Sequence, residues 1–201
     1  MYADLTDAIS LNYSRIRSSQ SVYSSKLWRI ITKIEETRIA SEEIRSTKVF
    51  NKVFLISMVD IEYLRRCGGQ GYYLLENGVN AFSTPISTTR NDICFIGKMN
   101  TIPNSDAVRY FIKEIWPIVK SAYSDSKFHV IGADPSSDII SYDGVNDVIV
   151  HGKVESVSEI AQQCKVSVAP MRIGAGVQNK VLESMSMGIP VVSTSIGNDL
   201  S

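Results

Sequence analysis

The sequence predicts an α/β protein built on a parallel β-sheet with helices on both faces. Short apolar runs alternate with helical patterns from residue 92 to residue 194, as strands joined by crossover helices require. Glycines follow four of these runs, at Gly97, Gly132, Gly152 and Gly174. Residues 165–194 add one complete unit of strand, glycine loop, helix and strand. Together these observations place ligand-accessible backbone at the carboxyl ends of the strands.

The composition is that of a soluble globular protein. Of 201 residues, 44% are hydrophobic and 21% are charged, and 21 basic residues balance 21 acidic ones, which gives no indication of nucleic-acid binding. The cysteines Cys67, Cys94 and Cys164 are far apart and odd in number. They predict reduced thiols with no disulfide framework and no metal site. A signal peptide and an apolar run of about 18 residues are both missing, so a cytoplasmic protein is expected.

The first part of the chain, residues 1 to about 48, is predicted to be helical because it contains no glycine or proline. Residues 11–34 carry five basic residues and no acidic one, and Leu27, Trp28, Ile30 and Ile31 lie among them. A basic helix with tryptophan is typical of peripheral contact with an anionic membrane. The alternative, which the sequence favours, is a helix that packs within its own domain and keeps a solvated basic side.

A further α/β segment follows. Residues 52–57 and 72–75 are predicted strands, and residues 60–64 form a short helix that Gly68 and Gly69 end. Residues 83–90 are polar and contain Pro85, which indicates a domain boundary. The sequence therefore predicts two parts, residues 1–85 and residues 86–201.

The second part is predicted to hold five strands, at residues 93–96, 128–131, 148–150, 165–169 and 191–194. A helix over residues 104–123, capped by Asn104 and kinked near Pro117, follows the first of them. Shorter helices are expected at residues 158–164 and from Asn179 to Gly188. His129 lies in an apolar run and is interpreted as a core histidine.

The loop between residues 170 and 180 carries the chemistry. Gly174 and Gly176 permit close approach of the backbone to a ligand. A helix that begins near Asn179 offers free N–H groups to an anion. Lys180 stands in its first turn, where the helix dipole disfavours a cation unless an anion lies there.

Glu183 lies on the same side of this helix as Lys180, while Val181, Leu182 and Met185 are expected to face the sheet. A lysine for a diphosphate and a carboxylate for ribose hydroxyls indicate a sugar-nucleotide site. The alternative is an ordinary βαβ unit whose Lys180 and Glu183 form a solvated pair.

Residues 170–192 resemble the signature of the family 4 glycosyltransferases of the two-domain GT-B fold, in the form P-L-R-x-x-x-G-x-Q-N-K-V-L-E-A-M-A-M-G-x-P-V-V. The resemblance is greatest to the sugar transferases of bacterial exopolysaccharide and exosortase loci. It implies that residues 1–85 are the last βαβ part of the N-terminal acceptor domain with the hinge. Residues 86–201 would be the Rossmann-like C-terminal donor domain, and the chain is expected to lack elements at both ends.

Two more segments extend the resemblance. Residues 96–104 are similar to the family motif f-x-G-x-M-x-x-x-P-N, and residues 152–154 are similar to its G-x-V segment near the nucleotide base. The donor site implied by the resemblance comprises Gly97, Lys98, Asn104, Gly132, Val154, Arg172, Gly174, Ala175, Gly176, Gln178, Asn179, Lys180, Val181 and Glu183.

One departure affects the donor sugar. Ala175 stands where most members carry a second glutamate, so sugar contacts are expected from the backbone of residues 174–176 or from Gln178. The implied activity is retaining transfer from a nucleotide-sugar to a glycan or lipid-linked acceptor in cell-surface polysaccharide synthesis, without metal or cofactor. Peripheral contact with the inner face of the plasma membrane would run through residues 11–34.

The catalytic base is expected in the missing N-terminal half, so the isolated chain is expected not to turn over. A sugar-nucleotide epimerase of the same fold and a non-catalytic binding fragment or scaffold remain alternatives. A dehydrogenase is disfavoured, because the first strand of the second part lacks the G-x-G-x-x-G that such a domain requires.

Overall fold

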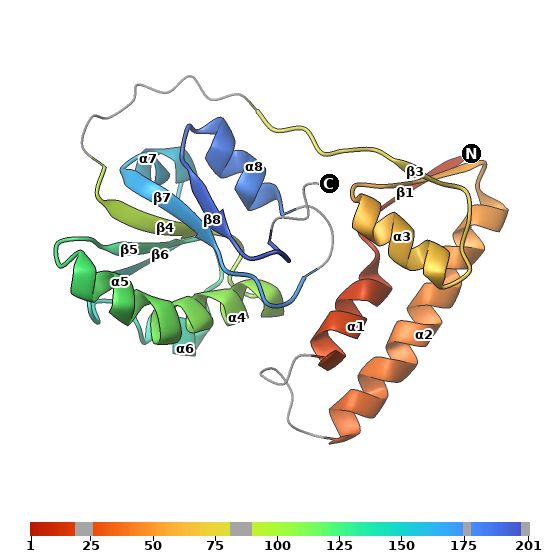
Figure 1. Cartoon of the computed structure of the whole chain (residues 1–201), viewed down its shortest axis with the longest axis horizontal. Helices are drawn as coiled ribbons and strands as arrows, with labels where there is room; N and C mark the ends of the chain where they lie inside the picture. The colour runs from red at the N-terminus through yellow and green to blue at the C-terminus, as the bar shows by residue number, and fades with distance from the viewer. Residues whose placement is uncertain (19–25, 81–89, 175–177, 198–201) are drawn as a thin grey trace. The chain divides into compact units, whose positions relative to one another are not determined.

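The computed structural model describes residues 1–18, 26–80, 90–174 and 178–197 (Figure 1). The chain divides into two compact units. The first comprises Met1–Gly78 together with Ile173–Gln178, and the second comprises Val79–Arg172 together with Asn179–Gly197.

The first unit holds a parallel sheet of order β1-β2-β3, formed by Tyr2–Thr6, Lys52–Leu55 and Tyr72–Leu74. Helices α1 (Ile9–Ser18) and α2 (Lys26–Val49) connect β1 to β2, and α3 (Met58–Arg66) connects β2 to β3. Apolar side chains from the sheet, α1 and α3 form the core: Ala8, Leu11, Val53, Leu55, Ile61, Leu64 and Tyr72.

Strand β1 corrects the prediction that the chain is helical from its first residue. Its sequence, Tyr-Ala-Asp-Leu-Thr, alternates between exposed and half-buried side chains and pairs in parallel with β2. Thr6 then adopts a positive φ of 62°, which ends the strand. Pairing with a strand about 50 residues away decides the conformation here, and a local pattern contains no information on that partner.

Buried acidic side chains of the first unit hold the start of α1. Asp60 Oδ2 accepts from the backbone N–H of Ala8 at 2.7 Å, and Glu43 Oε1 accepts from that of Ser10 at 3.3 Å. Amides at a helix N-terminus need acceptors from outside the helix, so these carboxylates have a structural role. Burial raises the pKa of Glu43, and the bonds from Ser10 oppose this effect.

The second unit is a five-stranded parallel sheet of order β6-β5-β4-β7-β8. Its strands are β4 (Asp92–Ile96), β5 (Phe128–Ile131), β6 (Val148–Gly152), β7 (Cys164–Ala169) and β8 (Val191–Ser193). Strands β5 and β6 lie on one side of β4 in the sheet, and strands β7 and β8, which come later in the chain, lie on its other side. The carboxyl ends of β4 and β7 therefore flank a topological switch point, where ligands bind in open α/β sheets.

Helices cover both faces of this sheet, as predicted (Figure 1). Along β4, Phe95 points into the core beneath α4 (Ile102–Tyr110) and α5 (Trp116–Ala122), where the rings of Phe111, Trp116 and Phe128 pack against one another at tilted angles. Cys94 and Ile96 point to the opposite core, beneath α7 (Val157–Ala161) and the end of α8 (Asn179–Ser186). The short helix α6 (Ser137–Ile140) was not predicted.

The helix predicted over residues 104–123 is a composite of α4, the π-helical turn η1 (Phe111–Ile115) and α5. The π-turn ends at Ile115, two residues before Pro117, which cannot donate to the carbonyl four residues earlier. The helix also begins earlier than expected. Thr101 is the N-cap, so the prediction that Asn104 caps the helix was wrong.

The buried face of α8 also differs from the prediction. Val181 is buried, but Met185 is 57% exposed, contrary to expectation. Ser184 faces the sheet instead, and its hydroxyl lies 2.9 Å from that of Ser167 on β7. His129 is buried, with its ring nitrogens 3.1 Å from Asp92 Oδ2 and 2.8 Å from His151 Nε2, as a core histidine requires. In the described part of the chain, no helix is long and apolar enough to cross a membrane.

Candidate functional site

Lys180 lies at the switch point of the second unit. It occupies the first turn of α8, and its ammonium nitrogen donates to Oδ1 of Asn104 on α4 at 2.7 Å. The same nitrogen lies 3.7 Å from Met171 Sδ and 5.2 Å from the centre of the Phe95 ring. An ammonium group half-buried above an aromatic ring has lost much of its hydration, so it favours a compensating anion.

Asn104 links this lysine to the loop after β4. Its Nδ2 donates to the carbonyl oxygen of Lys98 at 2.8 Å, which leaves Oδ1 facing the ammonium group. Nδ2 would also lie only 2.9 Å from a Cβ atom at position 97. Gly97 therefore lets the Asn104 amide approach the strand end closely enough to orient Lys180.

Gly132 brings the ends of β4 and β5 together. Its φ is +153°, and a Cβ atom there would lie 1.8 Å from the carbonyl oxygen of Gly97. Its N–H donates to the carbonyl of Gly152 at the end of β6 at 3.1 Å. Glycine at this position thus allows three adjacent strand ends to form one edge.

The electrostatics of Lys180 and Glu183 are dominated by desolvation. Burial lowers the pKa of Lys180 to about 8, and the Coulomb attraction of Glu183 opposes this shift only in part. Burial likewise raises the pKa of Glu183 against the attraction of Lys180. Both shifts show that the two groups are more desolvated than a surface helix pair. A bound diphosphate would favour the charged form of Lys180.

Arg172, three residues beyond the end of β7, forms contacts within the second unit. Its guanidinium forms a bidentate ion pair with the buried Asp106 of α4, at 3.0 and 2.6 Å, and lies 4.5 Å from the centre of the Tyr110 ring. This geometry holds the end of β7 against α4. Donor binding by Arg172, which the resemblance implied, would have to coexist with this pair.

Lys98 adds a second cation to the same edge. Its ammonium group is exposed and lies 3.7 Å from Asp134 Oδ2, beside the loop after β5. Val154, predicted to lie near a nucleotide base, is half-buried just beyond the end of β6.

Besides Arg172 and Val154, the predicted site residues fall into three groups. Contacts within the second unit bring together Gly97, Lys98, Asn104, Gly132, Lys180 and Glu183. Asn179 is the exposed first residue of α8, Val181 is buried behind it, and Gly174 and Gln178 group with the first unit. Ala175 and Gly176 lie outside the described residues.

Sequence reasoning missed the side chains beneath and beside Lys180. Phe95 and Met171 form the apolar surroundings of Lys180. Asp106 forms an ion pair with the guanidinium group of Arg172. The apolar character of Phe95 and Met171 indicated only core positions. Asp106 stands two residues after Asn104, the last residue of the motif, but its partner Arg172 is 66 residues away in the sequence.

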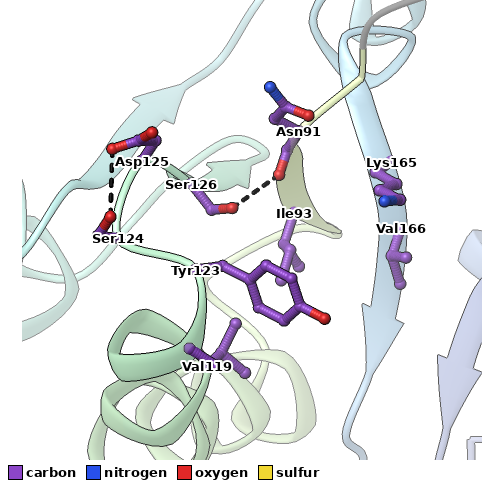
Figure 2. A pocket seen from close by; sticks show the side chains of 10 residues that line it. Asn91, Ile93, Val119, Tyr123, Ser124, Asp125, Ser126, Lys165 and Val166 are labelled. Atoms are coloured by element: carbon purple, nitrogen blue, oxygen red, sulfur yellow. Dashed lines mark hydrogen bonds between the residues drawn. The ribbon is translucent and has the colours of Figure 1, made fainter.

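A pocket of about 570 Å³ lies at the opposite edge of this sheet, where β4 and β7 begin (Figure 2). Several of its polar groups already bond to one another: Ser126 Oγ donates to the carbonyl of Asn91 at 2.9 Å, and Ser124 Oγ to Asp125 at 3.2 Å. Its exposed cation is Lys165. Ligands of open α/β sheets bind at the carboxyl ends of the strands rather than at their amino ends. The carboxyl ends of β4, β5 and β7, where Gly97, Gly132 and Lys180 lie, are therefore the better candidate site, and they are called the Lys180 edge below.

A doubly wound parallel sheet with a desolvated lysine at its switch point defines a Rossmann-like domain. The family model described as "Glycosyl transferases group 1" matches residues 90–200, more than half of the chain. The chain therefore belongs to the group 1 glycosyl transferases. Among curated proteins, none matches it.

Solved structures agree with this fold. The chain is similar to a Staphylococcus aureus TarM variant solved with UDP (TM-score 0.67, 16% identity, 97% of this chain and 36% of that one). It is also similar to Anabaena HepE solved with UDP, with a TM-score of 0.67 and 13% identity over 99% of this chain and 54% of that one. The pneumococcal O-GlcNAc transferase GtfA, solved with UDP and GlcNAc, matches with a TM-score of 0.61 and 13% identity over 79% of this chain and 33% of that one. The chain thus spans between a third and about half of each of these proteins. At such identities the likeness shows the fold alone.

Proposed function

We propose that this chain binds a nucleotide-sugar donor at the Lys180 edge of its second unit, as part of a glycosyltransferase of EC class 2.4. The observation that carries the proposal is the placement of the Lys180 ammonium group. It is half-buried above Phe95, oriented by Asn104, and positioned at the first turn of a helix. These features suit a nucleoside diphosphate, because a desolvated cation and the positive end of a helix dipole both stabilise phosphate oxygens.

Each part of the donor has a matching group. Lys180 and the first amides of α8 would bind the diphosphate, and Lys98 adds positive charge at the rim. Glu183, one turn further along α8, would accept hydrogen bonds from ribose hydroxyls. Family membership supports this assignment, and so does the UDP named for TarM, HepE and GtfA.

The mechanism that these groups support is positioning with electrostatic stabilisation. When the bond between the sugar and the diphosphate breaks, negative charge grows on the leaving diphosphate. Lys180 would stabilise this charge, and its hydrogen bond to Asn104 would hold it in place before the donor arrives. Transfer would proceed with retention to a glycan or lipid-linked acceptor of cell-surface polysaccharide, without a metal. Sugar contacts would come from residues 174–176 or from Gln178.

Isothermal titration of the protein with UDP, GDP, ADP and the corresponding nucleotide-sugars tests the proposal. We expect one nucleoside diphosphate series to bind, and its nucleoside monophosphate to bind at least tenfold more weakly, since each lost phosphate contact costs about 1.5–3 kcal/mol. Absence of binding by every diphosphate to the folded protein would refute the donor site. A parallel assay for transfer of labelled sugar to extracted lipid separates a transferase from a protein that only binds the donor.

A further inference from the structure

The two histidines of the sequence, His129 and His151, contact each other on neighbouring strands of the second unit. Nδ1 of His129 lies 2.8 Å from Nε2 of His151, and the planes of the two rings differ by only 9°. Nε2 of His129 lies 3.1 Å from Oδ2 of Asp92. A carboxylate and two imidazoles therefore form one chain of hydrogen bonds across β4, β5 and β6.

These bonds assign the protons of the two rings. A carboxylate only accepts, so Nε2 of His129 carries a proton and Nδ1 of that ring has a lone pair. A proton on Nε2 of His151 supplies the donor that this lone pair requires. One added proton can bind to Nδ1 of His129 if His151 carries its own proton on Nδ1 instead. A second added proton would place two N–H groups opposite each other, which breaks the bond between the rings.

The bond between the rings holds the end of an edge strand. Among the described residues, β6 pairs only with β5, and the register of the two strands shifts between Val130 and Ile131. His151 is the residue before Gly152, the last residue of β6. The carbonyl of Gly152 accepts from the N–H of Gly132 at 3.1 Å, which joins β6 to the Lys180 edge. The ring contact thus lies next to the backbone bond that places this strand end.

We propose that Asp92, His129 and His151 form a proton-sensitive link that holds the end of β6 beside the Lys180 edge. The link is intact while the two rings carry at most one added proton. It breaks when the second proton binds, because two imidazolium rings at this distance repel each other. The effect on donor binding rests on the proposed function, whereas the link itself does not.

Neighbouring groups determine the pH at which the link breaks. Burial lowers the pKa of His151, the charge of His129 lowers it further, and the carboxylate of Asp143 opposes both effects. The register partners of His129 and Asp92 are the buried thiols Cys94 and Cys164. Helix α7 covers these thiols with apolar side chains, those of Val157, Ile160 and Ala161. The pKa of His151 therefore lies below the ordinary value of 6.5, so the free energy of unfolding should fall as the pH decreases from 6.5.

Side-chain NMR of histidine tests the link directly, because the chain has only two histidine rings. Before any added proton binds, both rings should show the tautomer with the proton on Nε2. On acidification the pair should bind protons in two steps separated by more than about one pH unit. Asp143→Asn retains an acceptor for the N–H of Val150 and should move the second step to lower pH. Two independent titrations with one midpoint would overturn the proposal.

Hydrogen exchange tests whether loss of the link reaches the strand end. The reference is the amide of Gly97, which donates to the carbonyl of Ile131 at 3.0 Å and does not involve β6. Relative to this amide, protection of the Gly132 amide should fall by up to roughly tenfold per pH unit between pH 6.5 and the second step. His151→Gln still offers a donor to His129 but cannot bind a proton, so its protection should not change with pH. The same pH dependence in the parent and in folded His151→Gln would contradict the proposal.

Donor binding separates this inference from the proposed function. In the parent, affinity for the nucleoside diphosphate should fall together with the protection of Gly132, measured relative to His151→Gln at each pH. If no diphosphate binds at any pH while the NMR and exchange results are as expected, the proposed function fails and the link stands. If the diphosphate binds the parent and His151→Gln with the same pH dependence, the link does not position the donor edge and the proposal is overturned.

Discussion

The Lys180 ammonium nitrogen lies 2.7 Å from Oδ1 of Asn104, a residue 76 positions earlier in the chain. The bond joins the start of α8 to the start of α4 across the switch point of the sheet. Nδ2 of the same amide donates to the Lys98 carbonyl, which fixes the Asn104 side chain. Asn104 therefore sets the position of the Lys180 ammonium group. Orientation before binding is what a site for a diphosphate requires.

Replacing Asn104 tests this positioning role. Asn104→Ala should weaken nucleoside diphosphate binding about five- to tenfold, because one hydrogen bond to a charged group is lost. Asn104→Asp should also weaken binding, yet raise the pH at which binding is lost, because a carboxylate favours the charged form of Lys180. The measurement is titration calorimetry over a pH series, with Asn91→Ala at the far edge of the sheet as control. Unchanged affinity in both Asn104 variants would contradict the role.

The desolvation of Lys180 predicts a pH dependence of stability. Its pKa is about 8 in the folded chain, whereas the ordinary pKa of a lysine side chain is 10.5. Between these values the unfolded state binds more protons, so the free energy of unfolding should rise with pH. Lys180→Met should lack this component of the rise.

Urea unfolding of the second unit, followed by Trp116 emission in a Trp28→Phe background, measures this difference between pH 8 and pH 10.5. Lys165→Met, which removes an exposed lysine, is the matched control. An identical pH slope for the parent and Lys180→Met would show that Lys180 is not desolvated.

Gly132 should be intolerant of a side chain. Gly132→Ala combines a positive φ with a clash against the Gly97 carbonyl, so we expect a loss of more than about 3 kcal/mol of unfolding free energy. Gly144→Ala is the control, because its φ is +75° but nothing lies within 4 Å of the added carbon. It should cost only about 1–2 kcal/mol. Equal losses would mean that close approach of the strand ends is unimportant.

The ion pair of Arg172 with Asp106 should stabilise the second unit. Arg172→Met leaves a carboxylate that is 8% exposed without its bidentate partner. We expect a loss of about 2 kcal/mol, less than for a fully buried pair because Arg172 is 35% exposed. Arg172→Met combined with Asp106→Leu should recover most of it in a double-mutant cycle. If Arg172→Met leaves stability unchanged but weakens diphosphate binding, Arg172 serves the donor instead.

Much of the second unit could be predicted from the sequence. Periodicity located its strands because they are short, largely apolar runs, and because a glycine or a proline follows each of them except β8. The motif placed Lys180 and Glu183 on one side of a helix start. Long-range partners could not be predicted, since the pairing of β1 with β2 and the bond from Lys180 to Asn104 depend on residues about 50 or more positions apart. The exposure of Met185 was mispredicted because Ser184 finds a hydroxyl partner on β7.

The central claim is that Lys180 and Glu183 bind the nucleotide. The most direct test is titration calorimetry of the parent, Lys180→Ala and Glu183→Gln with the preferred nucleoside diphosphate and its free nucleoside. Lys165→Ala and Glu159→Gln are the controls, since both positions are exposed and lie away from the Lys180 edge.

Removal of a charge-assisted bond should weaken diphosphate binding by roughly ten- to a hundredfold. Lys180→Ala should affect the diphosphate far more than the nucleoside, whereas Glu183→Gln should weaken both, because the ribose is common to them. Equal diphosphate affinity for the parent and the folded Lys180→Ala variant would contradict the account.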